Sequence, residues 1–469
     1  GDPVKETEIL SSSFRDPSGS VFCKEDQIYR QINLTYQSQF EHLVSSGLYD
    51  TLIQKNLLIT HDEIAENNFS VAENCYKIIK PKQIPYISYP YEWSYSQLKD
   101  AALCTMQVQE LAVAHGMVLK DASAYNIQFL NGRPVFIDTL SFEFYEEGKP
   151  WAAYKQFCQH FIGPLSLMAY TDERLSQLFR IYMDGPPLDL VSTLLPVKTW
   201  FKYSLLTHVH LHARTQRHYA NVAGESERDV VARPISKLAF QALMSSIENC
   251  VKGLHWKMSE TEWGDYYAAT NYQSEAMQHK EILVAEFLHS MPEKTTLLHD
   301  LGANDGHYSR IAATQGYNVM AQDIDPVAVE KNYLYEKKQN EHNILPLIQD
   351  LTNPSGGVGW ALTERDSFID RCNDSTILAL ALIHHLALSN NVPLEKLAEF
   401  FSSLAKYLII EFVPKEDSQV KRLLTTREDI FPHYHVQRFE QAFSSYFKIV
   451  RKEDIRDSHR TLYLLEKTE

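Results

Sequence analysis

From Leu297 onward the sequence alternates short apolar runs with segments of helical period, and this alternation restricts the possible fold more than any other feature. The predicted strands are "TTLLHDLG", "YNVMAQDID", "NILPLIQD", "STILALAL" and "YLIIEFV". Apolar strands separated by helices are typical of a parallel sheet that is covered on both faces. We therefore predict a doubly wound α/β domain that ends in an antiparallel hairpin of "FKIVRKED" and "RTLYLLEK".

The turn "LLHDLGANDGHYSR" places an acid and two glycines between the first predicted strand and the following helix. Glycines at this point let the backbone approach a bound ligand at the carboxyl end of the sheet. The second strand ends at Asp323, about 20 residues further on, where a carboxylate can accept hydrogen bonds from two ribose hydroxyls. The third strand ends with another acid, Asp350. Because the turn departs from GxGxxG, the order of the acids carries the prediction more than the glycines do.

This run of acids resembles class I S-adenosylmethionine-dependent methyltransferases over about residues 265–469. The resemblance implies a seven-stranded Rossmann-like sheet, with the terminal hairpin supplying the reversed seventh strand. It also implies Asp323 on the ribose and Asp350 near the adenine amine. The implied cofactor-binding residues are Tyr267, Asp300, Gly302, Asn304, Gly306, Asp323, Ile324, Asp350 and Leu351, of which Asp300 to Gly306 surround the methionine end.

Upstream of the first strand, "WGDYYAATNYQSEAMQHK" is rich in tyrosine. Tyr266, Tyr267, Tyr272 and Lys280 are candidates for a lid over the cofactor. An aromatic helix face that packs on the core explains the same pattern equally well, and both interpretations stay open.

Several longer stretches of sequence point to one family within this class. "LALALIHHLALSNNVPLEKLAEF", "IIEFVPKED", "WGDYY", "NPSGGVGW" and the closing "RTLYLL" are similar to the NoeA-like nodulation methyltransferases. The substrates of that family are poorly defined, so the similarity implies the class of enzyme and leaves the methyl acceptor open.

His384 and His385 are predicted to end the fourth strand, where neighbouring side chains point to opposite sides. One ring is then expected to face the cleft as a general base for a hydroxyl acceptor, because histidine titrates near neutral pH. The absence of an (N/D)PP(Y/F) motif favours oxygen over nitrogen as the acceptor atom. A purely structural role for both rings is the alternative. Glu411, at the end of the fifth strand, is a second catalytic candidate that grips substrate or orients a histidine.

The first half of the chain carries a different constellation in "VLKDASAYNIQFLNGRPVFIDTLSF". Asp121, Asn126 and Asp138 resemble the catalytic loop and metal-binding aspartate of kinases. The resemblance implies Asp121 on an acceptor hydroxyl, with Asn126 and Asp138 on Mg²⁺ beside ATP.

Several departures from the kinase pattern weigh against phosphate transfer. Leu119 stands in place of the usual histidine, and "DTL" stands in place of DFG. Arg30 stands in place of the strand lysine, and an arginine can contact phosphate but is not equivalent to a lysine. We therefore expect an α+β, kinase-like accessory domain that has lost catalysis, with a bifunctional kinase–methyltransferase as the alternative.

The domain boundaries follow from these patterns. We expect a flexible leader over 1–15, the kinase-like domain over 16–250 and the methyltransferase domain over 251–469. The expected methyl acceptor is a small molecule, a glycan or, less favoured, a protein.

Composition restricts the partners and the compartment. The 469 residues carry a net charge of −15, which repels phosphate backbones, so no nucleic acid is expected. No apolar run approaches the ~18–20 residues of a membrane span, so no membrane partner is expected. Six cysteines without CxxC spacing indicate a reducing cytoplasm and no metal site of that kind.

Overall fold

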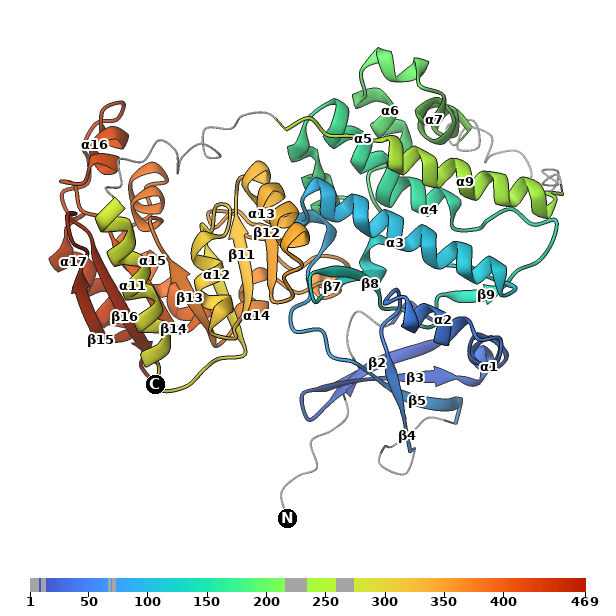
Figure 1. Ribbon diagram of the computed structural model, residues 1–469, viewed down its shortest axis with the longest axis horizontal. Coiled ribbons are helices and arrows are strands. Elements are labelled where there is room, and N and C mark those ends of the chain that lie inside the picture. Colours follow the sequence, from blue (N-terminus) through green and yellow to red (C-terminus); the bar gives the residue numbers. More distant parts are fainter. Residues whose placement is uncertain (1–7, 10–13, 66–68, 70–72, 216–233, 259–273) are drawn as a thin grey trace. The chain divides into compact units, whose positions relative to one another are not determined.

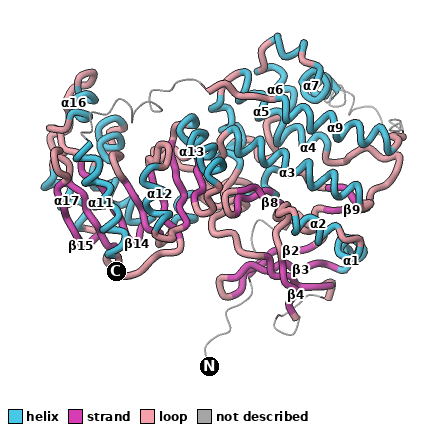
Figure 2. Tube along the Cα trace, in the orientation of Figure 1, coloured by secondary structure: helices cyan, strands magenta, loops and turns pink. Residues whose placement is uncertain are grey.

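The computed structural model describes residues 8–9, 14–65, 69, 73–215, 234–258 and 274–469. The chain divides into two compact units. The first comprises Gly1–Lys257 together with Val358–Arg365, and the second comprises Met258–Gly357 and Asp366–Glu469. Both units mix helices and strands, as Figures 1 and 2 show, so the expected mixed α/β architecture is present.

The first unit contains a five-stranded antiparallel sheet in the order β1-β2-β3-β5-β4. Its strands are β1 (Glu8–Ile9), β2 (Gly19–Lys24), β3 (Gln27–Asn33), β4 (His61–Ile64) and β5 (Cys75–Pro81). The β2–β3 turn has positive φ at both Glu25 and Asp26, the backbone twist that suits a two-residue hairpin. Strand β1 lies inside the segment predicted to be a flexible leader, and its two residues pair with β2.

A helical part follows this sheet in the first unit. Its central helix is α3 (Tyr95–Ala114), which begins with a capping box between Ser94 and Gln97. The two small strand pairs are β6 (Met117–Leu119) with β9 (Phe142–Phe144), and β7 (Ile127–Leu130) with β8 (Arg133–Phe136). Within the described residues, the α-helices that come after α3 are α4 (Tyr154–Phe157), α5 (Gly163–Tyr170), α6 (Leu188–Leu194), α7 (Tyr203–Leu205) and α9 (Lys237–Gly253). Two further helices, α1 (Gln37–Ser45) and α2 (Leu48–Gln54), lie between β3 and β4 of the sheet.

The second unit is built on a seven-stranded sheet in the order β12-β11-β10-β13-β14-β16-β15. Five neighbouring strands, β12, β11, β10, β13 and β14, are parallel to one another. Strand β16 runs antiparallel to both of its neighbours, β14 and β15. The strands are β10 (Leu297–Leu301), β11 (Asn318–Asp323), β12 (Ile344–Ile348), β13 (Ser375–Ala379), β14 (Ala405–Phe412), β15 (Phe447–Asp454) and β16 (Thr461–Lys467).

Helices cover both faces of this sheet. The helices are α11 (Ser274–Ser290), α12 (His307–Thr314), α13 (Pro326–Gln339), α14 (Phe368–Cys372), α15 (Leu394–Leu404), α16 (Ser418–Leu424) and α17 (Val436–Ser444). Along β14, Leu408 and Ile410 join the core under α15 and α17, whereas Ile409 joins the core under α11 and α12. This alternation explains why the central strands are continuously apolar. None of the helices in the described ranges combines the length and apolar character needed to cross a membrane.

Candidate active site at the carboxyl edge of the second sheet

The turn after β10 depends on left-handed backbone. Gly302 (φ 72°), Asn304 (φ 51°) and Gly306 (φ 86°) all have positive φ. A Cβ on Gly302 would lie 3.2 Å from Leu382 Cδ1, and one on Gly306 would lie 2.5 Å from Arg310 Nη1. Glycine is therefore favoured at both positions by the left-handed backbone, whereas the side-chain ends closest to an added Cβ could move aside. The result is a tight turn that ends as helix α12 begins.

Asp323, the last residue of β11, is tied to this glycine turn. Its Oδ2 accepts a hydrogen bond from the Asn304 backbone N–H (2.8 Å), and its Oδ1 accepts one from Asp325 N–H (2.9 Å). The side chain is half-buried, and burial raises its pKa to about 6. The neighbouring Ile324 is 54% exposed, so an apolar surface adjoins the carboxylate at the same strand end.

Asp300 lies deeper than the sequence analysis implied. The residue is 2% exposed, and Ser309 Oγ donates a 2.7 Å hydrogen bond to its Oδ2. Burial raises the pKa of this carboxyl to about 7. Because Ser309 belongs to α12, Asp300 joins the end of β10 to the helix that follows the glycine turn.

Asp350 and Leu351 lie just beyond β12. Asp350 Oδ1 accepts hydrogen bonds from the backbone N–H (2.9 Å) and hydroxyl (2.7 Å) of Thr352, which fixes the carboxylate within its own turn. Leu351 packs against the core of the sheet. The Gln349 N–H donates to the carbonyl of Asp323 (2.9 Å), so the ends of β11 and β12 are joined. The three predicted acids thus end three adjacent strands.

The prediction that His384 and His385 end an extended strand was wrong. Strand β13 stops at Ala379, Ala381 turns the chain with φ 50°, and both histidines lie at the start of a helical turn. Their rings are therefore on neighbouring helical positions, with centroids 4.2 Å apart, instead of on opposite faces. His384 is fully buried, and neither of its ring nitrogens has a hydrogen-bond partner among the described residues.

His385 is the more accessible of the two rings, because it is half-buried. Burial lowers the pKa of His385 to about 4 and lowers that of His384 well below its usual value. Both imidazoles are therefore neutral at pH 7.

Glu411 is fully buried near the end of β14, and its Oε1 accepts three hydrogen bonds. The donors are Lys280 Nζ (3.0 Å), Arg460 Nη1 (3.2 Å) and the Ala381 N–H (2.7 Å). Burial by itself would raise the pKa of Glu411, but the Lys280 and Arg460 cations outweigh it and hold the pKa below its usual value. Asp417 binds the other side of Arg460 at 2.8 Å. Glu411 therefore fixes the turn that carries the two histidines.

This ion network also includes Lys280, one of the four residues suggested for the lid. Lys280, suggested as a lid residue, is 2% exposed and bonded to Glu411, with its ammonium 4.9 Å from the ring centroid of Tyr308. The tyrosines at 266, 267 and 272 lie outside the described residues. Sequence reasoning missed Arg460, because a single arginine before the last strand has no periodicity that marks it as buried.

In the first unit the residues of the predicted catalytic-loop motif come together. Asp121 Oδ1 accepts hydrogen bonds from Ser123 N–H (3.0 Å) and Gln156 Nε2 (2.8 Å). The pKa of Asp121 is raised, first by burial and then by the nearby Asp138 charge, and lowered in part by a hydrogen bond from Asn126. The three residues predicted from the catalytic-loop pattern are therefore neighbours.

Arg30, in β3, forms an ion pair with Asp138 and a second one with Asp16 (3.0 Å). Burial would raise the pKa of Asp138, but the Arg30 guanidinium and the Ser141 hydroxyl together hold it below its usual value. A guanidinium therefore lies against the carboxylate that was predicted to hold Mg²⁺. Across the described ranges, no three His, Cys, Asp or Glu side chains gather as a metal site.

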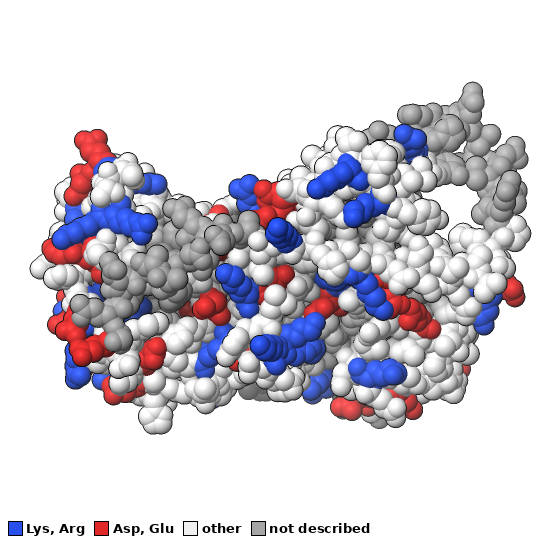
Figure 3. Space-filling view, turned by 45° about the horizontal axis from the view of Figure 1, so that its top comes forward, with Lys and Arg blue, Asp and Glu red and all other residues white. Residues whose placement is uncertain are grey.

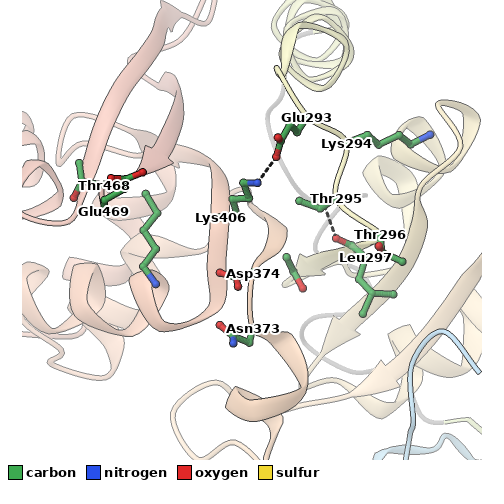
Figure 4. A pocket seen from close by; sticks show the side chains of 12 residues that line it. Glu293, Lys294, Thr295, Thr296, Leu297, Asn373, Asp374, Lys406, Thr468 and Glu469 are labelled. Atoms are coloured by element: carbon green, nitrogen blue, oxygen red, sulfur yellow. Dashed lines mark hydrogen bonds and ion pairs between the residues drawn. The ribbon is translucent and has the colours of Figure 1, made fainter. Parts of the chain in front are cut away.

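A polar hollow of about 630 Å³ lies at the opposite edge of the second sheet, where the parallel strands begin (Figure 4). It is lined by residues such as Thr295, Asp374 and Thr468, and its rim carries the ion pair between Lys406 and Glu293. None of the predicted site residues lines this hollow. The carboxyl edge of the sheet is therefore the better candidate for chemistry.

The strand order, with one reversed strand and an acid at or just beyond the carboxyl end of three adjacent parallel strands, is that of an α/β domain of the class I methyltransferase type. No protein-family model matches the chain. The chain is 34% identical to the nodulation protein NoeA of Rhizobium meliloti (strain 1021) over 463 residues, which are 98% of this chain and 96% of that protein. The chain therefore belongs to the NoeA family.

Solved structures give weaker similarities. The N-methyltransferase NodS from Bradyrhizobium japonicum WM9 has a TM-score of 0.30 at 9% identity, covering 42% of this chain and 99% of NodS. The magnesium protoporphyrin IX methyltransferase ChlM from Synechocystis PCC 6803 has a TM-score of 0.30 at 18% identity, covering 41% and 84%. The bifunctional kinase-methyltransferase WbdD has a TM-score of 0.29 at 12% identity, covering 43% and 42%. Similarities this weak do not bear on activity or substrate.

The Glu411 network generates a stability prediction. Glu411→Ala removes the carboxylate that Lys280 and Arg460 share, and removing one partner of a buried ion pair costs about 3–5 kcal/mol. The free energy of unfolding in urea should fall by that amount, and Glu411→Gln should lose less because it still accepts from Ala381 N–H. The control is Glu293→Ala, whose ion pair is exposed and whose loss should leave stability almost unchanged. Equal stability of Glu411→Ala and the control would contradict the assigned role.

Proposed function

We propose that the chain transfers a methyl group from S-adenosylmethionine to a hydroxyl of a small molecule or glycan, in the cytoplasm. The observation that carries the proposal is the edge of the second sheet, where Asp323 is bonded to a glycine turn in left-handed conformation. A turn of this kind after the first strand, followed by an acid after the second, is a general arrangement for binding nucleosides.

The residues present fit this cofactor. Each Asp323 oxygen has one backbone donor and keeps a lone pair for a ribose hydroxyl. Ile324 offers an exposed apolar side chain for an adenine face, and Asp350 lies at the next strand end. The glycine turn, from Gly302 to Gly306, lets the backbone approach the methionine end. When bound, S-adenosylmethionine supplies an electrophilic methyl group on a sulfonium.

His385 is the proposed group that accepts the proton of the acceptor hydroxyl. It is neutral at pH 7 because burial lowers its pKa to about 4, and its ring is more accessible than that of His384. Glu411 acts as a positioning residue, because it holds the Ala381 N–H at the start of the turn that leads to the histidines. His384 lies behind His385, and its buried ring nitrogens lack partners among the described residues, so a bound molecule or water is the proposed partner.

The proposed role of Asp323 predicts weaker cofactor binding when its charge is removed. Asp323→Asn should weaken S-adenosylmethionine binding by roughly 1.5–3 kcal/mol, or about 10- to 150-fold in Kd at pH 8, because it loses charge-assisted hydrogen bonds. For the wild type, affinity should fall about tenfold between pH 8 and pH 5, since the pKa of about 6 means that lower pH protonates the carboxylate.

Isothermal titration calorimetry across pH 5–8 measures both effects, with Asp350→Asn as a milder control because that carboxylate is already engaged by Thr352. No binding by the wild type, or the same affinity and the same pH dependence in Asp323→Asn, would overturn the assignment.

The histidine proposal predicts a defect in turnover and not in cofactor binding. His385→Ala should lower methyl transfer about 10²- to 10⁴-fold, the usual contribution of a general base. The measurement is transfer of labelled methyl to the acceptor that a panel of glycans and metabolites identifies, with S-adenosylhomocysteine affinity as the control. Unchanged turnover in His385→Ala and in His384→Ala would exclude the role.

For the first unit we propose a kinase-like accessory domain that positions or recognises the acceptor. The cluster of Asp121, Asn126 and Asp138 supports the kinase-like interpretation, and the Arg30 ion pair weighs against a metal on Asp138. A bifunctional kinase–methyltransferase, using ATP and Mg²⁺ in this unit, and a protein as methyl acceptor remain the rival proposals. Figure 3 shows both basic and acidic side chains on one face, and the net charge of −15 supports the proposal that nucleic acid is not a partner.

The accessory role predicts that wild-type protein does not transfer phosphate. Incubation with labelled ATP, Mg²⁺ and the same panel should give no more labelled product than Asp138→Ala gives, because the Arg30 guanidinium competes with Mg²⁺ for the carboxylate. Phosphate transfer by the wild type that disappears in Asp138→Ala would favour the bifunctional enzyme instead.

A further inference from the structure

A short turn in the helical part of the first unit exposes three large apolar side chains within seven residues. Val197, Phe201 and Tyr203 are 75%, 87% and 79% exposed. They lie on the 3-10 helix Val197–Phe201 and at the start of α7. Exposed apolar residues are normal when scattered singly, but a cluster of them marks an interaction surface.

The turn is firmly anchored from beneath. The fully buried Thr199 shares a 2.8 Å hydrogen bond with His210 Nε2, and Ser192 shares a 2.7 Å hydrogen bond with His210 Nδ1. The ring of His210 also stacks on Trp200 with centroids 4.1 Å apart. The exposed side chains therefore project from a fixed backbone, so binding through them would cost little ordering of the turn.

The stretch of sequence that forms the turn is basic, opposite in sign to the chain as a whole. Between positions 190 and 215 the sequence contains Lys198, Lys202 and Arg214 but no Asp or Glu, whereas the net charge of the chain is −15. Lys198 and Lys202 are exposed and alternate with the apolar side chains. Figure 1 draws α6 and α7 at the end of the first unit farthest from its five-stranded sheet, so the turn lies at the edge of this unit.

We propose that this basic, aromatic turn docks on an anionic lipid surface. Aromatic and aliphatic side chains next to lysines are suited to the boundary between headgroups and acyl chains, because the lysine stems bury while the ammonium groups meet anionic headgroups. A second copy of this chain fits less well, since a two-fold contact would bring Lys198 and Lys202 against their own counterparts. The expectation of no membrane partner rested on the lack of a span, and docking through a surface turn needs none.

The test is sedimentation of the full chain with vesicles of phosphatidylcholine alone or with about one-third phosphatidylglycerol. We expect binding to the anionic vesicles that weakens as salt is raised. Phe201→Ser/Tyr203→Ser should lower the partition coefficient about tenfold or more, because it removes the inserted side chains. Lys198→Gln/Lys202→Gln should also lower it roughly tenfold and should remove most of the salt dependence.

The matched control is Leu238→Ser, which changes a side chain that is 78% exposed on α9 of the same unit and should leave the partition coefficient unchanged. Thermal unfolding verifies that each variant is folded. Failure of the wild type to bind anionic vesicles, equal binding to both vesicle types, or a loss equal to that in Leu238→Ser would overturn the proposal. Self-association of the wild type that Phe201→Ser/Tyr203→Ser abolishes would assign the turn to a second copy instead.

Discussion

The buried carboxylate of Glu411 is the interaction on which the candidate site depends most. A single oxygen accepts from Lys280 in α11, from Arg460 before β16 and from the Ala381 N–H after β13. Three segments that are far apart in the sequence are therefore held at one point of the sheet edge. Leu382, next to Ala381, lies against the glycine turn at Gly302, so the histidine turn and the proposed cofactor turn are packed together.

The electrostatics of this edge follow from burial. Burial raises the pKa of Asp323 to about 6 and lowers that of His385 to about 4, so both groups shift toward their neutral forms. Glu411 is the exception, because two cations keep it ionised. The proposed enzyme thus combines a buried ion network, in which Glu411 stays ionised, with carboxyl and imidazole groups whose protonation a ligand can change, which is typical of functional sites.

The residues at the strand ends could be predicted from the sequence, but the contacts around them could not. Asp323 and Gly302 could be predicted because strand–turn–helix patterns and glycines leave local signals. The histidines were misplaced because "ILALALIHHL" is continuously apolar, and Ala381, with positive φ, carries no turn signal. Arg460 and the Arg30 ion pair could not be predicted, since both depend on contacts between residues distant in sequence.

Binding of S-adenosylmethionine at the carboxyl edge of the second sheet is the proposal on which the others depend. Hydrogen–deuterium exchange of the full chain with and without S-adenosylhomocysteine tests it most directly, because exchange reports each backbone segment separately. Binding at this edge should slow exchange in 300–306, 323–325 and 349–351 and leave 16–250 unchanged. No protection in these three segments at saturating ligand, or protection confined to 16–250, would contradict it.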